Sequence, residues 1–205
     1  MKSPLEKLFR SECIHPLAKG AYTTDKGSDH DYIEGYYAEE FGDKQDVVTD
    51  ILEIGVMSGG SLILWTKWFP KANVEGIDIF PETVDRYNEI KGNSEYPNVK
   101  IHIADAYDPE VADKFTDGKY DYIFDDGPHS LESMKNAISL YMKKLKKGGK
   151  LIIEDVQNEK WFDELASHAD SLGYHQNRTF DLRKNKNRSD DMIFELTNNG
   201  TQKAK

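Results

Sequence analysis

Short apolar runs alternate along the chain with longer segments in which apolar residues recur at helical spacing. A short apolar run between polar or glycine residues is typical of a buried strand, and the longer spacing is typical of a helix that covers it. Strands separated by helices predict a parallel sheet, and two strands with no helix between them predict an antiparallel pair. The expected strands are 50–54, 74–79, 99–103, 120–126, 150–156, 178–182 and 191–196, and the expected helices are 62–68, 82–91, 131–145 and 159–171.

This order predicts an α/β, Rossmann-like fold with a seven-stranded, mostly parallel sheet and an antiparallel edge strand. One domain accounts for 205 residues, because domains commonly run to roughly 100–200 residues. Residues 1–47 are too polar for a buried strand and too aromatic for a linker, so we expect an N-terminal helical cap with a loop over the ligand site. The expected divisions are a cap or lid over 1–47, a core over 48–197 and a frayed tail over 198–205.

The first strand ends in a glycine-rich turn that leads directly into a helix. A helix N-terminus beside glycines offers free backbone N–H groups to the anionic end of a ligand. The turn that binds dinucleotides needs a glycine two residues after the first, so that a pyrophosphate can approach the backbone. Met57 occupies that position, and a pyrophosphate ligand is therefore disfavoured.

The spacing Glu53-x-Gly55-x-x-x-Gly59-Gly60 resembles the S-adenosylmethionine turn of class I methyltransferases. Asp78 closes the second strand, where acidic residues of nucleotide-binding folds take the ribose hydroxyls. The alternative is a glycine-rich corner with an incidental acid. The residues expected to bind this cofactor are Glu53, Gly55, Gly59, Gly60, Ser61, Asp78, Asp125 and Asp105, the last at the adenine amino group.

Acidic residues end four successive strands of the predicted sheet, along the edge where open α/β sheets bind their ligands. Carboxylates placed close together repel one another unless a cation lies between them. Asp126, Glu154 and Asp155 supply only oxygen ligands, which suit Mg²⁺, Mn²⁺ or Ca²⁺ and do not suit structural zinc. We expect these three residues to hold a divalent cation; two solvated pairs of acids are the alternative.

His129 follows Asp126 by three residues and stands at the start of a predicted helix. The positive end of a helix dipole disfavours a cationic imidazole, so this histidine is expected to be neutral at neutral pH. A neutral imidazole can act as a general base beside the cation; a half-buried histidine that caps the helix is the alternative. In the cap, we expect Lys26, His30 and Tyr37 to contact the substrate.

Composition argues against nucleic acids as substrates. A net charge of −10 disfavours a broad interface with DNA or RNA, which requires Lys and Arg to neutralise phosphates. The lysine-rich stretch 143–147 is expected at a helix C-terminus, where cations are favourable. The polar N-terminus argues against a signal peptide, and the lack of a run of 18 apolar residues argues against a membrane-spanning helix. The single cysteine cannot form a disulfide within the chain, which agrees with a reducing compartment. We expect a cytoplasmic location, in the host cytoplasm if the protein is viral.

Several motifs together resemble the metal-dependent sugar O-methyltransferases of macrolide biosynthesis, whose type members are the mycinamicin and macrocin enzymes. In that family, the Asp of an Asp-Gly-x-His motif and a later acid pair bind Mg²⁺, and the His serves as general base. The resemblance implies a class I methyltransferase fold, with Asp126, Glu154 and Asp155 as Mg²⁺ ligands and His129 as the base. The matching motifs are Ile51-Leu52-Glu53-Ile54-Gly55-Val56-x-x-Gly59-Gly60-Ser61, Thr24-Asp25-Lys26-Gly27-x-x-His30, Asp126-Gly127-x-His129 and Glu154-Asp155.

The resemblance implies an S-adenosylmethionine- and Mg²⁺-dependent O-methyltransferase that acts on a sugar hydroxyl. The chain is shorter than the macrolide enzymes, which favours a compact acceptor such as rhamnose or another deoxyhexose, in a glycan or a glycosylated metabolite. The alternatives are a catechol or phenolic O-methyltransferase and a non-catalytic methyltransferase-like domain that docks a glycan. A homo-oligomer and a fusion to glycosyltransferase domains are both compatible with the sequence.

Overall fold

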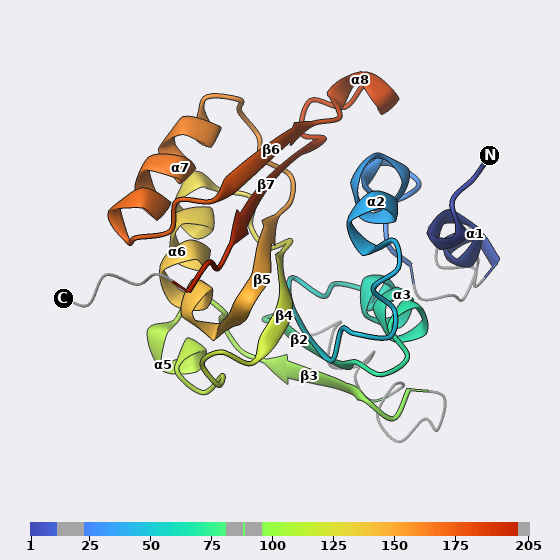
Figure 1. The fold of residues 1–205 in the computed structure, drawn as a ribbon, viewed down its shortest axis with the longest axis horizontal. Helices are drawn as coiled ribbons and strands as arrows, with labels where there is room; N and C mark the ends of the chain where they lie inside the picture. Colours follow the sequence, from blue (N-terminus) through green and yellow to red (C-terminus); the bar gives the residue numbers. More distant parts are fainter. Residues whose placement is uncertain (12–22, 81–87, 89–95, 201–205) are drawn as a thin grey trace.

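A computed structural model describes residues 1–11, 23–80, 88 and 96–200 of the chain. Seven strands form one sheet in the order β3-β2-β1-β4-β5-β7-β6 (Figure 1). The neighbouring pairs from β3 to β5 are parallel, whereas β7 is antiparallel to both β5 and β6. The strands are β1 (Asp50–Ile54), β2 (Asn73–Asp78), β3 (Val99–Ile103), β4 (Tyr120–Asp125), β5 (Leu145–Ile153), β6 (Asn177–Asp181) and β7 (Met192–Thr197).

The predicted α/β fold with a seven-stranded, mostly parallel sheet is confirmed, with one refinement. The antiparallel strand is β7, and it lies one place in from the edge that β6 forms. Antiparallel strands can be joined by a short connection, and only the short segment with α8 (Arg183–Lys186) separates β6 from β7. The pair therefore folds back on itself, and β7 lies against β5.

Helices cover both faces of the sheet. The segments that precede β1 lie with α3 (Gly60–Trp68) on one face, and the helices that follow β3, β4 and β5 lie on the other (Figure 1). The helix expected over 82–91 falls outside the described residues, apart from Asn88. The remaining helices are α1 (Pro4–Ser11), the π-helix η1 (Ile33–Tyr37), α2 (Ala38–Phe41), α5 (Pro109–Ala112), α6 (Leu131–Tyr141), the 3₁₀ turn η2 (Met142–Lys144) and α7 (Trp161–Ser171).

Neighbouring residues of the central strands point to opposite faces and so supply two hydrophobic cores. Ile51 packs in the core with Trp65 of α3, whereas Leu52 packs in the other core with Ile138 of α6. All four side chains are buried, and burial of one such side chain contributes about 1.5–3 kcal/mol. The two cores hold the sheet rigidly between its helical layers and so fix the positions of the strand ends.

The helix predicted over 131–145 ends earlier than expected, at Tyr141. A 3₁₀ turn follows, and Leu145 already pairs with Tyr120 of β4. The N–H of Lys119, directly before β4, donates to the carbonyl of Lys144 at 2.8 Å. This carbonyl is therefore paired with the β4 segment and not with a further turn of helix. Lys143 and Lys144 lie in the last turn of this helical segment, as predicted for the lysine-rich stretch 143–147, but residues 145–147 already belong to β5.

The helical segments ahead of β1 are tied to the sheet by buried acids. Glu40 of α2 accepts from Lys150 of β5 at 2.5 Å and from the hydroxyl of Tyr122 of β4 at 2.7 Å. Glu195 of β7 accepts from the hydroxyl of Tyr36 at 2.6 Å. Both carboxylates are buried, so these contacts fix the N-terminal segments against three strands.

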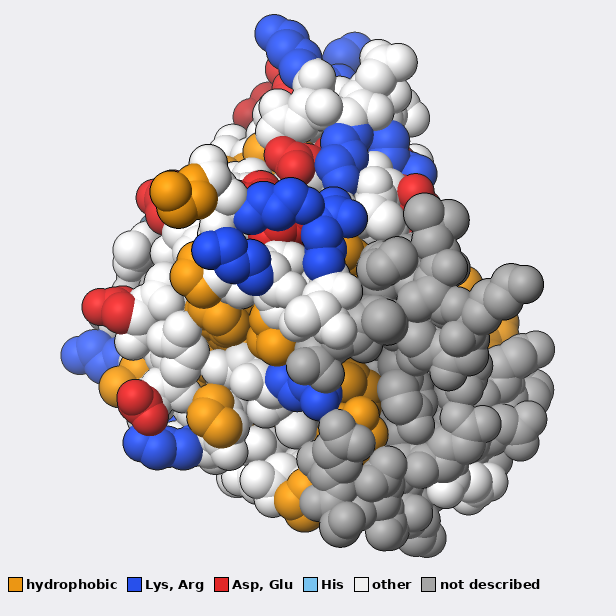
Figure 2. Space-filling model, turned by 90° about the vertical axis from the view of Figure 1, so that its right-hand side faces the viewer, with side chains coloured by type: hydrophobic (Ala, Val, Ile, Leu, Met, Phe, Trp, Pro, Cys, Tyr) orange, Lys and Arg blue, Asp and Glu red, His pale blue; other side chains and the backbone are white. Residues whose placement is uncertain are grey.

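Lys and Arg side chains gather in the upper half of the face shown in Figure 2, with Asp and Glu side chains among them. Some cations of the chain form ion pairs on its surface; for example, the guanidinium of Arg183 lies 2.6 Å from Asp181 and 3.0 Å from Glu159. Exposed pairs of this kind contribute at most about 1 kcal/mol.

Among the residues with described structure, no helix has the length and apolar character needed to cross a bilayer.

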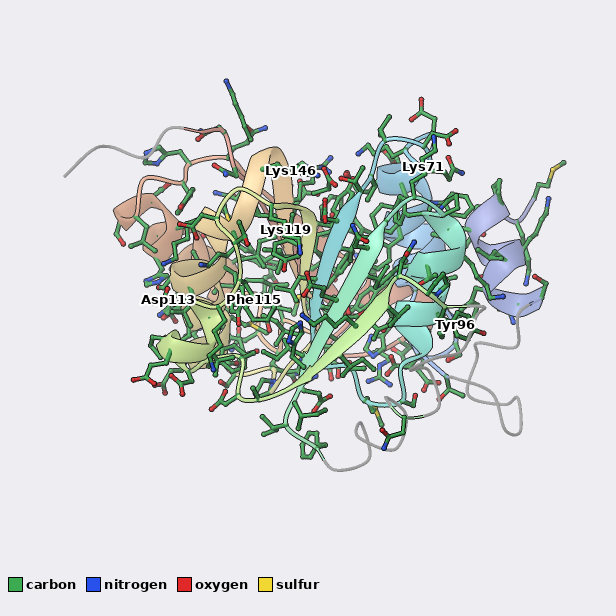
Figure 3. The ribbon with its side chains drawn as sticks, turned by 90° about the horizontal axis from the view of Figure 1, so that it is seen from below. Lys71, Tyr96, Asp113, Phe115, Lys119 and Lys146 are labelled. Carbon is green, nitrogen blue, oxygen red and sulfur yellow. The ribbon has the colours of Figure 1, made fainter. Side chains whose placement is uncertain are left out.

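Glu75 of β2 anchors a polar cluster on the sheet face away from α3. Its carboxylate contacts Lys119 and accepts from the hydroxyl of Tyr120 at 2.9 Å, and it lies 2.8 Å from Nε2 of His102. Figure 3 shows Lys119 and Phe115 on one side of β2 and β3, with Lys71 and Tyr96 on the other. Burial raises the pKa of Glu75, but these hydrogen bonds outweigh burial and lower it from 4.5 to about 2.

We expect Glu75→Gln to lower the free energy of unfolding at pH 7 by about 1–2 kcal/mol, after the shift is discounted for solvent screening. Because the folded-state pKa lies below 4.5, this stabilisation is present above pH 4.5 and is lost as the pH falls toward 2. Urea unfolding at pH 7 and pH 3 measures it. Glu164→Gln, at an exposed pair with Lys135, is the control and should change stability by less than about 0.5 kcal/mol. An equal loss for Glu75→Gln at both pH values would contradict the ionic role.

Candidate functional site

A cavity of about 940 Å³ lies at the carboxyl edge of the sheet, where open α/β sheets bind ligands. Its wall is made by the turn after β1, the ends of β2 and β3, the loop from β4 to α6 with the first turns of α6, one residue after β5, and Asp25 of the N-terminal segment. The wall residues used below are Gly55, Met57, Ser58, Asp78, Ile79, Phe80, Asp105, Tyr107, Asp126, His129 and Asp155.

The glycines of the turn are required by close packing as well as by backbone conformation. Gly55 has φ of +85°, and a Cβ there would lie 2.0 Å from the carbonyl oxygen of Asp126. A Cβ on Gly60 would lie 2.1 Å from the carbonyl of Thr23, which crosses the turn from the N-terminal segment. Gly55 borders the cavity, whereas Gly59 and Gly60 are buried away from its wall. Two of the glycines therefore let chain segments pack together.

Asp78 and Asp105, both predicted to contact the cofactor, lie on the cavity wall. One oxygen of Asp78 accepts from the backbone N–H groups of Val56 and Met57, both at 2.8 Å. The carboxylate thus fixes the turn while it borders the cavity. Asp105 is exposed and accepts from the N–H of Tyr107 at 2.9 Å.

Three large apolar side chains are exposed on the same wall: Met57 is 79%, Ile79 58% and Phe80 59% exposed. Apolar groups exposed side by side in a concave site mark a surface that a ligand covers. Together with two acids at neighbouring strand ends, this wall fits a nucleoside, which has a flat ring and a ribose diol.

The other expected cofactor residues lie beneath the wall. Glu53 is fully buried and accepts from the indole N–H of Trp65 at 3.1 Å, while Ser61 is also buried. Asp125 accepts from the hydroxyl of Tyr107 at 2.5 Å. Burial raises the pKa of Glu53 and of Asp125 to about 7 in each case. These side chains lie beneath the cavity wall and pack against the glycine-rich turn and the end of β4.

Asp126, His129 and Asp155 come together on the wall, with one possible ligand atom from each lying within 4.8 Å of the others. Nε2 of His129 lies 3.6 Å from Asp155 and 4.0 Å from Asp126. Burial, and then the charge of Asp126, raise the pKa of Asp155, so two carboxylates are held close at an energetic cost. Two hard oxygen donors and an adjacent imidazole fit a divalent cation such as Mg²⁺ or Mn²⁺.

Glu154, the third expected metal ligand, is only 1% exposed and lies away from this wall. One of its oxygens contacts the ammonium of Lys26, and the other accepts from the hydroxyl of Tyr37. Lys26 also lies 2.7 Å from Asp126 and 3.5 Å from Glu53. Burial lowers the pKa of Lys26, but the charges of Asp126, Glu154 and Glu53 outweigh it and hold the pKa well above 10.5.

Lys26, His30 and Tyr37, which we expected to contact the substrate, are each at most 2% exposed and lie behind the carboxylates. A tight turn in which the carbonyl of Asp25 accepts from three N–H groups directs this segment inward. His30 stacks on Tyr32 and lies 3.4 Å from Asp155. These three side chains therefore support the acids, while Asp25 of the same segment borders the cavity.

Two tyrosines that the sequence did not single out hold wall residues in place. The hydroxyl of Tyr32 donates to Asp155 at 2.5 Å and accepts from its backbone N–H at 3.1 Å. Tyr107 lies on the wall and holds Asp125. The signal for Tyr32 was an aromatic residue directly after the polar stretch 23–31.

Backbone strain is concentrated at this site. Met57, His129 and Asp155 have φ of 47°, 54° and 53°, in the left-handed region that non-glycine residues rarely adopt. In the described part of the chain, one other non-glycine residue does so, Asn187. Each such residue costs of order 1 kcal/mol, and this strain persists where the surrounding structure imposes it, typically at functional sites.

Residues 46–197 match a family model described as "Methyltransferase domain". Among curated proteins, an 8-demethyl-8-alpha-L-rhamnosyl tetracenomycin-C 2'-O-methyltransferase of Streptomyces olivaceus is 31% identical over 147 residues, which are 67% of this chain and 36% of that protein. The mycinamicin VI 2''-O-methyltransferase of Micromonospora griseorubida is 27% identical over 162 residues, 74% of this chain and 38% of that protein. This chain thus spans little more than a third of the length of these relatives.

The fold is similar to that of solved methyltransferase-like structures. MycE, a methyltransferase from the mycinamicin pathway solved with Mg and SAH, has a TM-score of 0.65 and 18% identity over 96% of this chain and 55% of that chain. A fibrillarin pre-rRNA processing protein of Methanococcus jannaschii has a TM-score of 0.61 and 20% identity over 77% of this chain and 69% of that chain. At these identities the similarity establishes the fold.

Proposed function

We propose that this chain, which belongs to the family described as "Methyltransferase domain", transfers the methyl group of S-adenosylmethionine to a hydroxyl of a sugar. The acceptor would be a deoxyhexose such as rhamnose, in a glycan or a glycosylated metabolite. The observation that carries the proposal is one cavity whose wall includes both the glycine turn and the group of Asp126, His129 and Asp155. The relative named for 2'-O-methylation of a rhamnosyl tetracenomycin supports the class of acceptor.

The wall residues divide into those that would hold the cofactor and those that would act on the acceptor. Asp78 would hold the ribose hydroxyls, Asp105 the adenine amino group, and Phe80 would cover the ring. S-adenosylmethionine supplies a methyl group that its sulfonium already activates. The chain is left with two tasks, which are to orient the acceptor hydroxyl and to remove its proton, and orientation alone can lower the barrier by several kcal/mol.

Asp126 and Asp155 would hold a divalent cation at the acceptor end of the cavity. Such an ion lowers the pKa of a coordinated hydroxyl and can fix two neighbouring hydroxyls at once. The hydrogen bonds of Tyr32 keep Asp155 in one orientation, as the partners of metal ligands commonly do.

His129 would be the general base. Its Nε2 lies on the side of the two carboxylates, and its ring is about one third exposed, so it can receive the proton of a bound hydroxyl. A free sugar hydroxyl ionises far above the reference histidine pKa of about 6.5, and the base alone is therefore mismatched. By holding a divalent ion, the two carboxylates would lower the pKa of the hydroxyl and so bring it closer to the pKa of the histidine.

We expect EDTA to lower the rate of methyl transfer by at least about a hundredfold and Mg²⁺ or Mn²⁺ to restore it, because the base cannot deprotonate an unassisted alcohol. The assay supplies S-adenosylmethionine and a panel of rhamnosides, other deoxyhexosides and catechols, with product identified by mass. Calorimetry in EDTA should show unchanged cofactor binding.

Three outcomes would contradict parts of the proposal. Full activity in chelator would show that the reaction does not require a metal ion. Turnover of catechols with no turnover of any glycoside would favour a phenolic O-methyltransferase. Binding of S-adenosylmethionine with no transfer to any acceptor would favour a glycan-docking domain.

A further inference from the structure

A second cavity, of about 800 Å³, lies on the face of the sheet that is turned away from α3. β2 and β3 form its floor, and the segment from α5 to the start of β4 forms the opposite wall. Phe115 and Lys119 of that segment lie on this side of the two strands (Figure 3). The volume is in the range of cavities that bind small molecules. Asp126, His129 and Asp155 do not line this cavity, so the proposed reaction makes no use of it.

Apolar side chains make up one part of the lining. Val99 and Ile103 come from β3, and Val111 and Phe115 come from the opposite wall. Ile103, at the end of β3, is 45% exposed. Ligand cavities are typically lined by apolar side chains together with a few polar groups that fix the orientation of the ligand. This part of the cavity is therefore suited to the apolar portion of a small molecule.

The acid of this cavity is already paired within the chain. Glu75 is the one acidic residue among the described lining residues, and it is 8% exposed. One of its oxygens contacts Lys119 and accepts from the hydroxyl of Tyr120 at 2.9 Å. The other oxygen lies 2.8 Å from Nε2 of His102. Because both oxygens are engaged, the carboxylate is not available to bind a cation.

Two lysines of the lining have no such partner. Lys100 of β3 and Lys114 of the opposite wall are exposed, and neither forms an ion pair with a described residue. The acids near Lys114 in sequence pair with lysines outside the cavity: Asp113 lies 3.0 Å from Lys143, and Asp117 lies 2.7 Å from Lys144. In a chain of net charge −10, this cavity therefore presents two positive charges that no described acid neutralises.

We propose that the second cavity binds a small organic anion, with its acidic group at Lys100 and Lys114 and its apolar portion against Phe115 and Ile103. The two ammonium groups attract an anion and repel a cation. A carboxylate, a phosphate and a sulfonate share the chemistry that these lysines recognise. The site is separate from the proposed reaction, because neither the divalent ion nor the acceptor hydroxyl is involved.

The test uses anilinonaphthalene sulfonate, an aromatic anion whose fluorescence rises when it binds in an apolar site. Ala104 lines both cavities, so the cofactor cavity is first filled with S-adenosylhomocysteine. We expect the full chain to bind the sulfonate at least about tenfold more tightly than N-phenylnaphthylamine, which has the same aromatic rings and no charge. Calorimetry measures both affinities and should give one sulfonate per chain.

The double variant Lys100→Gln, Lys114→Gln removes both charges from exposed positions. It should weaken binding of the sulfonate at least about tenfold and that of the neutral compound less than about twofold. The matched control is Lys160→Gln with Lys184→Gln, which changes the net charge equally at exposed lysines outside both cavities and should leave both affinities unchanged.

Three results would overturn the anion site. The first is equal binding of the charged and the neutral compound. The second is an affinity for the sulfonate that the double variant leaves unchanged. The third is loss of sulfonate binding when S-adenosylhomocysteine is present, which would place the anion in the cofactor cavity.

Discussion

Replacing Asp126 by asparagine should lower kcat/KM for methyl transfer at least about a thousandfold, which corresponds to about 4 kcal/mol of transition-state stabilisation. Asp126 belongs to the group that fits a cation and also lies 2.7 Å from Lys26. The amide keeps the shape of the side chain but removes its charge, so the ion loses a ligand and Lys26 loses one of three acids. The glycine turn is untouched, and cofactor affinity should therefore change by less than about threefold.

Single-turnover methyl transfer and calorimetry with S-adenosylhomocysteine measure these two effects separately. Asp163→Asn is the matched control, because Asp163 is an exposed aspartate on α7 away from the cavity. It should leave both quantities unchanged. If Asp126→Asn kept more than a tenth of the native rate, the ion would not be held by this carboxylate.

Gly55→Ala is expected to cost more than about 4 kcal/mol of folding stability, a loss that only a few mechanisms produce. The new Cβ would lie 2.0 Å from the carbonyl oxygen of Asp126, an atom that cannot move without displacing the end of β4. The residue must also keep φ of +85°. Since the same backbone carries the cavity wall, binding of the cofactor should be lost as well.

Gly118→Ala separates the two causes, because Gly118 has φ of +67° but no atom within 4 Å of its Cβ position. It tests backbone strain alone and should cost about 1–2 kcal/mol. Urea unfolding of both variants gives the comparison. Equal losses would show that the close approach of Gly55 to Asp126 contributes nothing, against our account of the turn.

The strands of the central sheet could be predicted from sequence because their apolar runs are short, β-branched and bounded by polar residues. The end of the helix over 131–145 could not. Leu145 continues the helical spacing of the preceding residues, and its pairing with Tyr120 depends on a contact with a distant strand. Local pattern and tertiary pairing compete there, and the pairing prevails.

The acidic residues at the sheet edge could be identified from the sequence. Which of them border the cavity and which are buried beneath it could not be predicted. Two pairs of neighbouring acids follow the same pattern. Asp125 and Glu154 are buried and accept hydrogen bonds from the hydroxyls of Tyr107 and Tyr37, respectively. Their neighbours Asp126 and Asp155 border the cavity. Alternation of side chains at the end of β4 could have indicated that only one of Asp125 and Asp126 faces the ligand, but the left-handed backbone of Asp155 has no such local signal. Which member does so depends on partners such as Lys26, 128 positions from Glu154, and no local pattern reports them.

The N-terminal segment described above bears on how this family can be recombined. The family model matches residues 46–197, yet Glu53, Glu154 and Glu195 within that range contact Lys26, Tyr37 and Tyr36 outside it. A chimera joined at the similarity boundary would inherit buried acids from one parent and their counterparts from the other. The exchangeable unit is therefore larger than the range that the family model matches, and an exchange should carry residues 23–41 together with the sheet whose buried acids they contact.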